Sequence, residues 1–423
     1  MIRPITALQT LQRFRADALT LFEELGVYED GVAAVDFGVQ RALVIGDPHL
    51  ATAILTSPAF DKGRESYGPL GTFAGFGSLR WLIGPTLPVL DGPEGLVRRR
   101  TVQPVYNGIL TRLAAVQARS PFPQLPDPGD DEFDLYPMVA AAIFHRFSEV
   151  MFGRPYAEHA AAISEVVSTA TTCLDILSKS YMPYVGVFGS AGATIRRCRA
   201  ALLAFAEIVY DDLSTLAVGD EPPPALLSLL SSGLSREEVL DEIVTQIVAG
   251  TETSSITTSW ALSELIAAPE WLEALRAAEP AEAEALAGRC VREATRMYPA
   301  FWTMIRVSKE DVSLVGRHIS ANTLLFVSPF CIHHNPAFWP EPDRFDPDRF
   351  RQRRGVRGDH MPFGYGARAC IGARLAHGII SETLLAFARQ LDLRPGAERP
   401  VRNPLIVVLK SHTGFPCRAS RRA

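Results

Sequence analysis

The sequence predicts a mainly α-helical fold with a minor β-sheet region. Apolar residues recur at helical spacing through most of the 423 residues. The longest such pattern covers 235–267 and opens with Ser235 and Glu238, which have the spacing of a capping box. Short apolar runs bounded by turn residues lie near the N-terminus and over 304–330, and these runs predict strands.

These patterns predict the elements in chain order. Residues 1–60 include a β-rich N-terminal lobe, with a helix over 7–25, strands over 32–37 and 42–45, and a turn at 46–48. Further helices are expected over 133–153, 158–177, 191–216, 235–267, 271–278 and 281–297. A Pro- and Arg-rich meander over 335–357, a Gly-rich loop over 363–372 and a helix reaching 390 follow. Without long internal repeats, residues 1–423 are expected to form one domain.

Composition narrows the class of protein. A hydrophobic fraction of 47% and a charged fraction of 21% describe a globular enzyme and not a disordered chain. The formal net charge of −5 argues against nucleic acid as the main partner. Arg3, Arg13, Arg15 and Asp17 interrupt the first apolar residues, so neither a signal peptide nor a membrane anchor is expected. The six cysteines lack CxxC pairs or disulfide-like spacing, which favours a cytoplasmic location.

The Gly-rich loop over 363–372 is the most informative segment. Gly364 and Gly366 allow tight bends and a close approach to a flat ligand. Cys370 precedes a predicted helix, whose N-terminal dipole favours a thiolate. Phe363 would provide an apolar wall beside the sulfur. Taken alone, a glycine pair and a cysteine describe equally well a turn with a small buried cysteine.

Two further patterns are ambiguous by themselves. The long helix contains Gly250 and seven Thr or Ser residues between 251 and 259, which are poor helix formers. Such a segment is either a bend packed against its neighbours or an opening in the helix. Glu293 and Arg296 are three residues apart and share a helix face. Oppositely charged residues at this spacing usually form an ion pair that is exposed to solvent.

Together, these segments resemble the cytochrome P-450 superfamily. The string FGYGARACIG over 363–372 has the form FGxGxRxCxG of the haem-thiolate loop. Glu293 and Arg296 match the ExxR pair, AGTETS over 249–254 matches the oxygen-facing helix, and LDGPE over 90–94 matches the segment before a propionate-binding arginine. The resemblance implies a triangular, single-domain helical prism that binds haem b (iron protoporphyrin IX), with the thiolate of Cys370 as the axial iron ligand. It is typical of a soluble bacterial member.

The resemblance also implies roles for individual residues. Thr253 would hydrogen-bond the activated dioxygen, and Glu252 would relay protons from solvent. The cofactor-binding residues would be Cys370, Arg99, Arg306, Arg368, Phe363, Gly364, Ala249 and Gly250. Glu293 and Arg296 would join Arg349 in a buried structural network. Gly95 departs from the family, since it stands where a propionate-binding histidine is usual. Arg98 and Arg100 beside Arg99 are interpreted as a solvated face.

The family's substrate-contacting segments identify a candidate pocket. It comprises the stretch 79–87 and the residues Ile247, Ala300, Phe301, Trp302, Met304, Ile406 and Val407. Ordinary core packing is the alternative for each of these positions. The bulky apolar members predict an apolar, medium-sized organic substrate.

The predicted reaction is haem-dependent monooxygenation, either hydroxylation or epoxidation, in secondary metabolism. Dioxygen supplies the inserted atom, and an external ferredoxin or flavodoxin with its reductase supplies the electrons. Surface arginines such as Arg98, Arg100, Arg368 and Arg374 would attract an acidic carrier. Two alternatives remain: a haem-thiolate protein that binds ligand without turnover, and a peroxide-using or non-oxygenating enzyme. The presence of Glu252 and Thr253 favours the monooxygenase over both.

Overall fold

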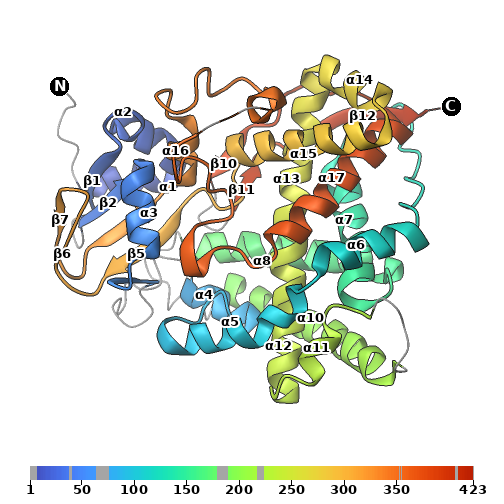
Figure 1. Cartoon of the computed structure of the whole chain (residues 1–423), viewed down its shortest axis with the longest axis horizontal. Coiled ribbons are helices and arrows are strands. Elements are labelled where there is room, and N and C mark those ends of the chain that lie inside the picture. Colours follow the sequence, from blue (N-terminus) through green and yellow to red (C-terminus); the bar gives the residue numbers. More distant parts are fainter. Residues whose placement is uncertain are drawn as a thin grey trace.

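Helices form most of the molecule; β1 (Val32–Asp36), β2 (Arg41–Ile45), β5 (Met304–Ser308), β6 (Val312–Leu314) and β7 (Arg317–Ile319) lie at one side of it, and β12 (Pro416–Arg421) lies at the opposite side near the C-terminus (Figure 1). The computed structural model describes residues 7–37, 41–62, 76–178, 189–216, 223–351, 353, 355–404 and 408–422. The described α-helices are α1 (Ala7–Glu24), α2 (Val27–Asp30), α3 (Pro48–Thr56), α4 (Phe76–Ile83), α5 (Gly92–Tyr106), α6 (Ile109–Arg119), α7 (Tyr136–Phe152), α8 (Ala160–Ser178), α10 (Ser190–Thr215), α11 (Leu227–Leu230), α12 (Arg236–Ile247), α13 (Thr253–Ala267), α14 (Pro269–Ala277), α15 (Pro280–Met297), α16 (Pro329–His334) and α17 (Ala373–Gln390). Within these described ranges, no helix is both long and apolar enough to cross a membrane.

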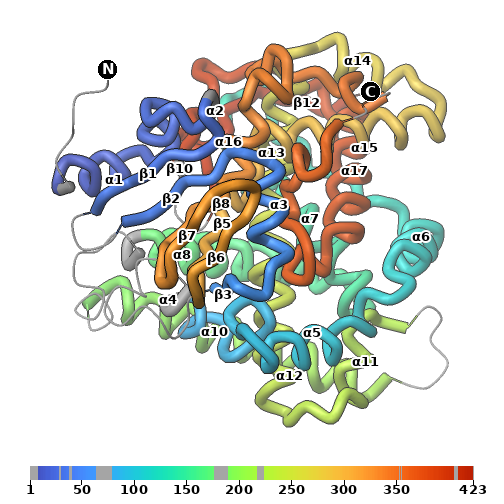
Figure 2. Tube along the Cα trace, turned by 60° about the vertical axis from the view of Figure 1, so that its left-hand side comes forward, coloured from blue at the N-terminus to red at the C-terminus, as the bar shows by residue number. Residues whose placement is uncertain are grey.

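The main sheet joins the N-terminal lobe to a segment almost 300 residues later in the chain. Its order is β1 (Val32–Asp36), β2 (Arg41–Ile45), β8 (Leu324–Val327), β5 (Met304–Ser308) and β3 (Phe60–Asp61). Strand β2 runs parallel to β8, and β5 pairs antiparallel with β8. Figure 2 shows these strands side by side, with α3 beside them. The predicted strands over 32–37 and 42–45 therefore share one sheet with β5 and β8 from the segment 304–330, whereas β6 and β7 of that segment pair only with each other.

Three smaller sheets complete the β structure of the described chain. They are β4 (Phe133–Asp134), β12 (Pro416–Arg421) and β9 (Leu391–Pro395); β10 (Arg402–Pro404) and β11 (Leu409–Ser411); and β6 (Val312–Leu314) and β7 (Arg317–Ile319).

Two local predictions were wrong, each for a physical reason. Of the expected turn at 46–48, Gly46 and Asp47 connect β2 to α3, and Pro48 is already the first residue of that helix, because the Asp47 side chain accepts a hydrogen bond of 2.7 Å from the backbone N–H of Leu50. The expected helix over 133–153 begins only at Tyr136, because Phe133 and Asp134 pair with the C-terminal strand β12. Helical periodicity carries no information about a strand partner so distant in sequence.

The predicted long helix is interrupted at its centre. Ser235 and Glu238 form the capping box that starts α12, and α13 ends at Ala267. Between these two helices lies η3 (Val248–Glu252), a single π-helical turn. A Cβ atom on Gly250 would lie 2.4 Å from Cε2 of Phe147 in α7, so only glycine allows this contact. The hydroxyl-rich segment therefore combines the two expected features: it packs tightly on one side and departs from α-helical geometry.

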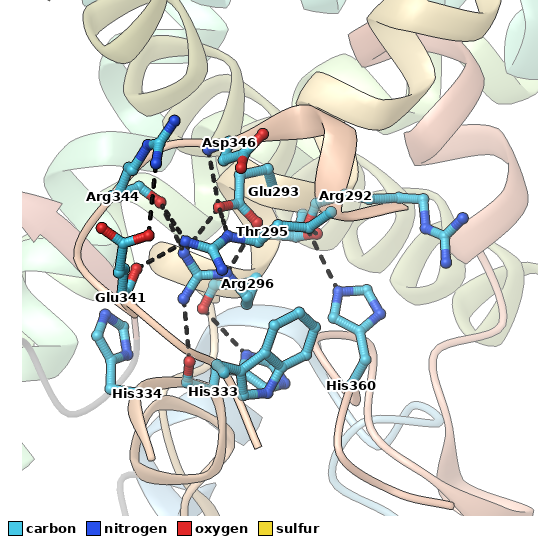
Figure 3. Close-up of polar contacts among 12 residues, drawn as sticks. Arg292, Glu293, Thr295, Arg296, His333, His334, Glu341, Arg344, Asp346 and His360 are labelled. Carbon is cyan, nitrogen blue, oxygen red and sulfur yellow. Dashed lines mark hydrogen bonds and ion pairs between the residues drawn. The ribbon is translucent and has the colours of Figure 1, made fainter. Parts of the chain in front are cut away.

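Glu293 and Arg296 on α15 form a completely buried ion pair (Figure 3). Nε and Nη2 of Arg296 each donate to a carboxylate oxygen of Glu293 at 2.8 Å. Arg349 donates through Nε to Oε1 of Glu293 at 3.2 Å, and the backbone N–H of Asp346 donates to the same oxygen at 3.1 Å. Buried charges require such complete partnering, and here the partners come from the meander.

The same network extends to the Gly-rich loop. Nη1 of Arg296 donates to the carbonyl oxygen of His333 at 3.0 Å, and Nδ1 of His333 lies 3.1 Å from the carbonyl oxygen of Arg296. Nε2 of His333 accepts the backbone N–H of Met361 at 3.0 Å, which leaves Nδ1 as the donor. Met361 in turn accepts the N–H of Gly364 in the loop at 3.0 Å. Helix α15 and the cysteine loop are thus joined through His333.

The buried histidines beside this network predict sensitivity to acid. Burial, with the nearby charge of Arg296, lowers the pKa of His334 to about 3 from an ordinary value of 6.5. Between pH 6.5 and 3, His334 is therefore protonated in the unfolded chain but neutral in the folded chain. The free energy of unfolding consequently falls as the pH drops through this range.

His334→Asn should reduce this loss by about 1.4 kcal/mol per pH unit within that window. Chemical denaturation at a series of pH values measures the effect. The exposed His318→Gln is the matched control and should retain the wild-type slope. An unchanged slope in His334→Asn would contradict the prediction.

Candidate functional site

The loop over 363–372 is held by its own backbone and by the end of α3. Cys370 donates its backbone N–H to the carbonyl oxygen of Phe363 at 2.8 Å, which closes the loop. Gly364 and Gly366 have φ angles of 75° and 73°, in the left-handed region that favours glycine. A Cβ atom on Gly366 would lie 2.8 Å from the carbonyl oxygen of Leu55, so the loop backbone rests directly on α3. Glycine was expected at these two positions, and the left-handed backbone at both, with the close contact to Leu55 at Gly366, gives the reason.

Cys370 lies immediately before α17 and differs from the other cysteines. The other five are buried, whereas Cys370 is exposed. Burial of the surrounding loop raises the pKa of the Cys370 thiol, while the backbone N–H groups of Gly372 and Ala373 and the charge of Arg99 act in the opposite direction. Protein atoms therefore surround the sulfur on most sides, and one side remains accessible. That arrangement suits a ligand that seals the opening and binds the thiolate.

A second open surface lies on the π-helical turn. The segments α12, η3 and α13 together form the central helix of the molecule. Within it Ala249 is exposed and Thr253 is partly exposed, although their neighbours Val248 and Glu252 are buried. The hydroxyl of Thr253 donates to the carbonyl oxygen of Ala249 at 2.7 Å. An exposed alanine at the middle of a long buried helix means that this helix face borders an open space.

Tyr106 connects the loop to the central helix. A Cβ atom on Gly372 would lie 3.3 Å from the ring of Tyr106, and the Tyr106 hydroxyl donates to Oε1 of Gln246 on α12. On another side, the sulfur of Met304 on β5 would lie 3.3 Å from a Cβ atom on Gly364. Helices α13 and α17 also contact each other (Figure 1). The cysteine loop, the sheet and the π-helical turn are therefore anchored around a common interior region.

A cluster of four cations lies beside the loop. Arg368 pairs with Oδ1 of Asp91 at 2.5 Å and donates to the carbonyl oxygen of Phe60 at 3.0 Å. Arg99 donates to the carbonyl oxygen of Ala369 at 2.9 Å. Arg306 is buried, and its Nε has no hydrogen-bond partner among the described residues.

The fourth cation, Lys62, was not expected from the sequence. Its Nζ donates to the carbonyl oxygens of Leu87, Pro88 and Leu90 at 3.2, 3.0 and 2.9 Å, and its backbone N–H donates to Asp91. A single lysine after a two-residue strand matches no motif, so only the fold could reveal it.

The cluster carries more positive than negative charge. Burial, together with repulsion by Arg306, Arg368 and Arg99, lowers the pKa of Lys62 to about 7 against the attraction of Asp91. Burial and the charge of Arg368 lower the pKa of Arg306 to about 10. Among the described residues, these four basic side chains interact with two carboxylates, Asp91 and Asp61, so basic groups outnumber acidic ones in the cluster. These groups could hold a dianionic ligand.

The position of Gly95 explains the departure seen in the sequence. Gly95 is buried, and a Cβ atom there would lie 2.9 Å from the carbonyl oxygen of Leu90. Lys62 donates to that same carbonyl oxygen. The first turn of α5 therefore has no space for a larger side chain at Gly95, and Lys62, which directly follows β3, lies next to this turn.

The candidate pocket residues divide into open and buried positions. Ala300 and Met304 are partly exposed, and Phe301 is 43% exposed. Ile247 and Trp302 are fully buried, and the Trp302 ring packs against Phe22 with the ring centroids 5.8 Å apart. Ile247 and Trp302 are therefore packed in the core, which was the alternative to a place in the pocket lining.

Other predicted positions fall elsewhere. Ile406 and Val407 lie outside the described residues. Arg98 is not part of a solvated face, because it pairs with Glu238 at 2.5 Å and with the buried Glu242 at 3.4 Å.

Comparison with known proteins agrees with this geometry. The family model described as Cytochrome P450 (cytochrome P-450) matches residues 110–415. A curated relative from Streptomyces melanosporofaciens, "Cyclooctat-9-en-7-ol 5-monooxygenase", is 29% identical over 406 residues, which cover 85% of this chain and 82% of the relative. "Cyclooctatin synthase" from the same organism is 33% identical over 180 residues, 38% of this chain and 39% of that protein.

Solved structures show the same fold. A 6-coordinated cytochrome P-450 from Thermus thermophilus superposes with a TM-score of 0.70 at 23% identity, over 96% of this chain and 98% of that chain. CYP175A1, from another strain of Thermus thermophilus, gives a TM-score of 0.73 at 22% identity, over 98% of both chains. With its matching family model, haem-thiolate loop and helical fold, this chain belongs to the cytochrome P-450 family of haem-thiolate monooxygenases.

Proposed function

We propose that this enzyme binds haem b through the thiolate of Cys370 and inserts one oxygen atom from dioxygen into an apolar, medium-sized organic substrate, by hydroxylation or epoxidation. The observation that carries this proposal is the setting of Cys370, an exposed thiol at the start of α17 with backbone N–H groups directed at its sulfur. When bound, the haem supplies the oxygen-activating chemistry, and the thiolate promotes O–O cleavage.

The charges around the loop fit the two propionates of haem b. Lys62, Arg99, Arg306 and Arg368 would hold these carboxylates, since basic groups outnumber acidic ones among the described residues of the cluster. The unpartnered Nε of Arg306 would gain an acceptor. Gly364 would let the backbone approach the ring plane, and Phe363 would shield the sulfur from water. Ala249 would leave room above the opposite face, whereas Gly250, also expected to border the haem, makes room for Phe147 on α7.

The π-helical turn would handle dioxygen and protons. The hydroxyl of Thr253 can turn from the carbonyl oxygen of Ala249, 2.7 Å away, toward the open side of the helix. There it can donate a hydrogen bond to an oxygen atom or to a water molecule. Glu252 would accept protons from solvent and pass them toward this hydroxyl.

The substrate is proposed to be a largely hydrocarbon alcohol or alkene of secondary metabolism. The Streptomyces melanosporofaciens relative that matches 406 residues is named as a monooxygenase of a cyclic alkenol. The open positions Ala300, Phe301 and Met304 are apolar, which favours a ligand of that kind. Electrons would come from a ferredoxin or flavodoxin with its reductase.

The ligand assignment predicts a spectrum. After reduction and treatment with carbon monoxide, the wild-type protein should show the strongly red-shifted Soret band of a haem thiolate. Cys370→Ala should lose this band because the sulfur is gone, while the buried Cys173→Ala should retain it as a matched control. Retention of the band in Cys370→Ala would refute the assignment.

The hydroxyl of Thr253 should govern coupling. Thr253→Ala should release most reducing equivalents without product, on the order of tenfold lower product per reductant consumed. Thr253→Ser keeps the hydroxyl and should stay close to wild type. Product and reductant are measured together under turnover. Full coupling in Thr253→Ala would exclude the proposed role.

Lys62 should make haem binding depend on pH. Its pKa of about 7 without a propionate should rise beside one, so binding takes up a proton above pH 7 and haem affinity falls as the pH increases. Lys62→Gln should weaken haem affinity about tenfold at neutral pH and abolish this dependence. Lys62→Arg should keep the affinity. Haem transfer to apomyoglobin measures dissociation, and an identical pH profile in Lys62→Gln would exclude this contact.

A further inference from the structure

Glu252 lies on a different face of the central helix from Thr253. Thr253 shares the open face with Ala249, four residues earlier, whereas Glu252 is 3% exposed and faces α7, α8 and β11. A carboxylate directed into the protein at the oxygen-handling turn requires partners that keep it charged.

Three side chains from distant parts of the chain surround this carboxylate. Nζ of Lys410 on β11 lies 2.5 Å from Oε1 of Glu252. The hydroxyl of Tyr136 on α7 donates to Oε2, and the hydroxyl of Thr171 on α8 lies 3.2 Å from Oε1. Burial and the charge of Glu252 raise the pKa of Tyr136 well above its ordinary value, so the phenol remains a donor. Asp134, near Tyr136, acts on it in the same direction.

Lys410 connects this buried group to solvent. Its side chain is 15% exposed, compared with 2% for that of Glu252. Nζ also lies 2.9 Å from the hydroxyl of Thr171 and 3.2 Å from that of Ser168, a partly exposed residue. The polar groups therefore form a continuous path from the surface at Ser168 and Lys410 to the carboxylate.

The backbone beside Lys410 is also held in place. The N–H of Leu409 donates to the carbonyl oxygen of Ala300 at 2.9 Å, and Nε1 of Trp260 on α13 donates to the carbonyl oxygen of Leu409 at 3.1 Å. The ammonium group is thus positioned by β11 against the same helix that carries Glu252.

From this geometry we propose that Lys410 is a positioning residue for proton delivery. It holds Glu252 ionised, so that the carboxylate takes a proton from solvent at the Lys410–Ser168 end and releases it on the Thr253 side. Each released proton is replaced by one from bulk water. The inference rests on the proposed oxygenation, which consumes protons.

A purely structural ion pair would have the same contacts, so the test must separate the two roles. Lys410→Met removes the charge and keeps much of the length of the side chain. A buried carboxylate without its cation takes up a proton more readily. Glu252 should therefore be protonated at neutral pH in Lys410→Met, and ionised again in Lys410→Arg.

The first measurement needs no turnover. Infrared difference spectra at neutral pH, taken between Lys410→Met and Lys410→Met/Glu252→Gln, should show a protonated-carboxyl band that is absent from the corresponding wild-type and Lys410→Arg pairs. Absence of the band in Lys410→Met overturns the proposal.

The second measurement follows product per reductant consumed across pH. Lys410→Met should be on the order of tenfold less coupled at neutral pH and should recover as rising pH restores the carboxylate. Lys410→Arg and the exposed control Lys309→Met should match wild type, and Glu252→Gln should show no recovery. A loss in Lys410→Met that is equal at every pH would mean a structural role and would overturn the proposal. Failure of the wild type to form product would instead refute the proposed oxygenation and leave the infrared result to decide the ion pair.

Discussion

The buried carboxylate of Glu293 is the constraint on which the cysteine loop depends. It is fully buried and accepts from Arg296, Arg349 and the backbone of Asp346. These partners join α15 to the meander, and His333 extends the connection to Met361 at the start of the loop. Because removing one partner of a buried charge is costly, the network ties these segments together. The loop that carries the sulfur is therefore connected to an ion pair that the sulfur itself does not touch.

Three charge clusters in the molecule differ in how completely they are balanced. The Glu293 cluster is closed and supports the fold. The cluster of Lys62, Arg99, Arg306 and Arg368 is open, since its positive charges exceed its carboxylates. The Glu252 group is balanced by Lys410 and still reaches solvent through it. The structural role of the first cluster and the ligand-holding and proton-handling roles proposed for the other two thus go with complete, incomplete and solvent-linked charge pairing.

The π-helical turn connects two of these roles. Gly250 allows Phe147 to pack against the helix on one side, while Ala249 and Thr253 remain open on another. Glu252 turns toward α7, α8 and β11. At this departure from α-helical geometry, the side proposed to face dioxygen and the side proposed to supply protons lie on different faces of the helix. This matches the observation that π-helical turns occur frequently at functional sites.

The sequence by itself determined the features that depend on local chemistry. Helix limits near Ala7, Ala267, Met297 and Gln390 follow from periodicity and caps. The Cys370 loop and the Glu293–Arg296 pair were identified by their resemblance to family motifs, because their spacings alone are ambiguous. Tertiary structure decided the features that need distant partners: the strand at Phe133, the core burial of Ile247 and Trp302, the place of Lys62 and the pairing of Glu252 with Lys410. A side chain's surroundings come from segments that are far apart in the chain, and no local pattern records which segments those will be.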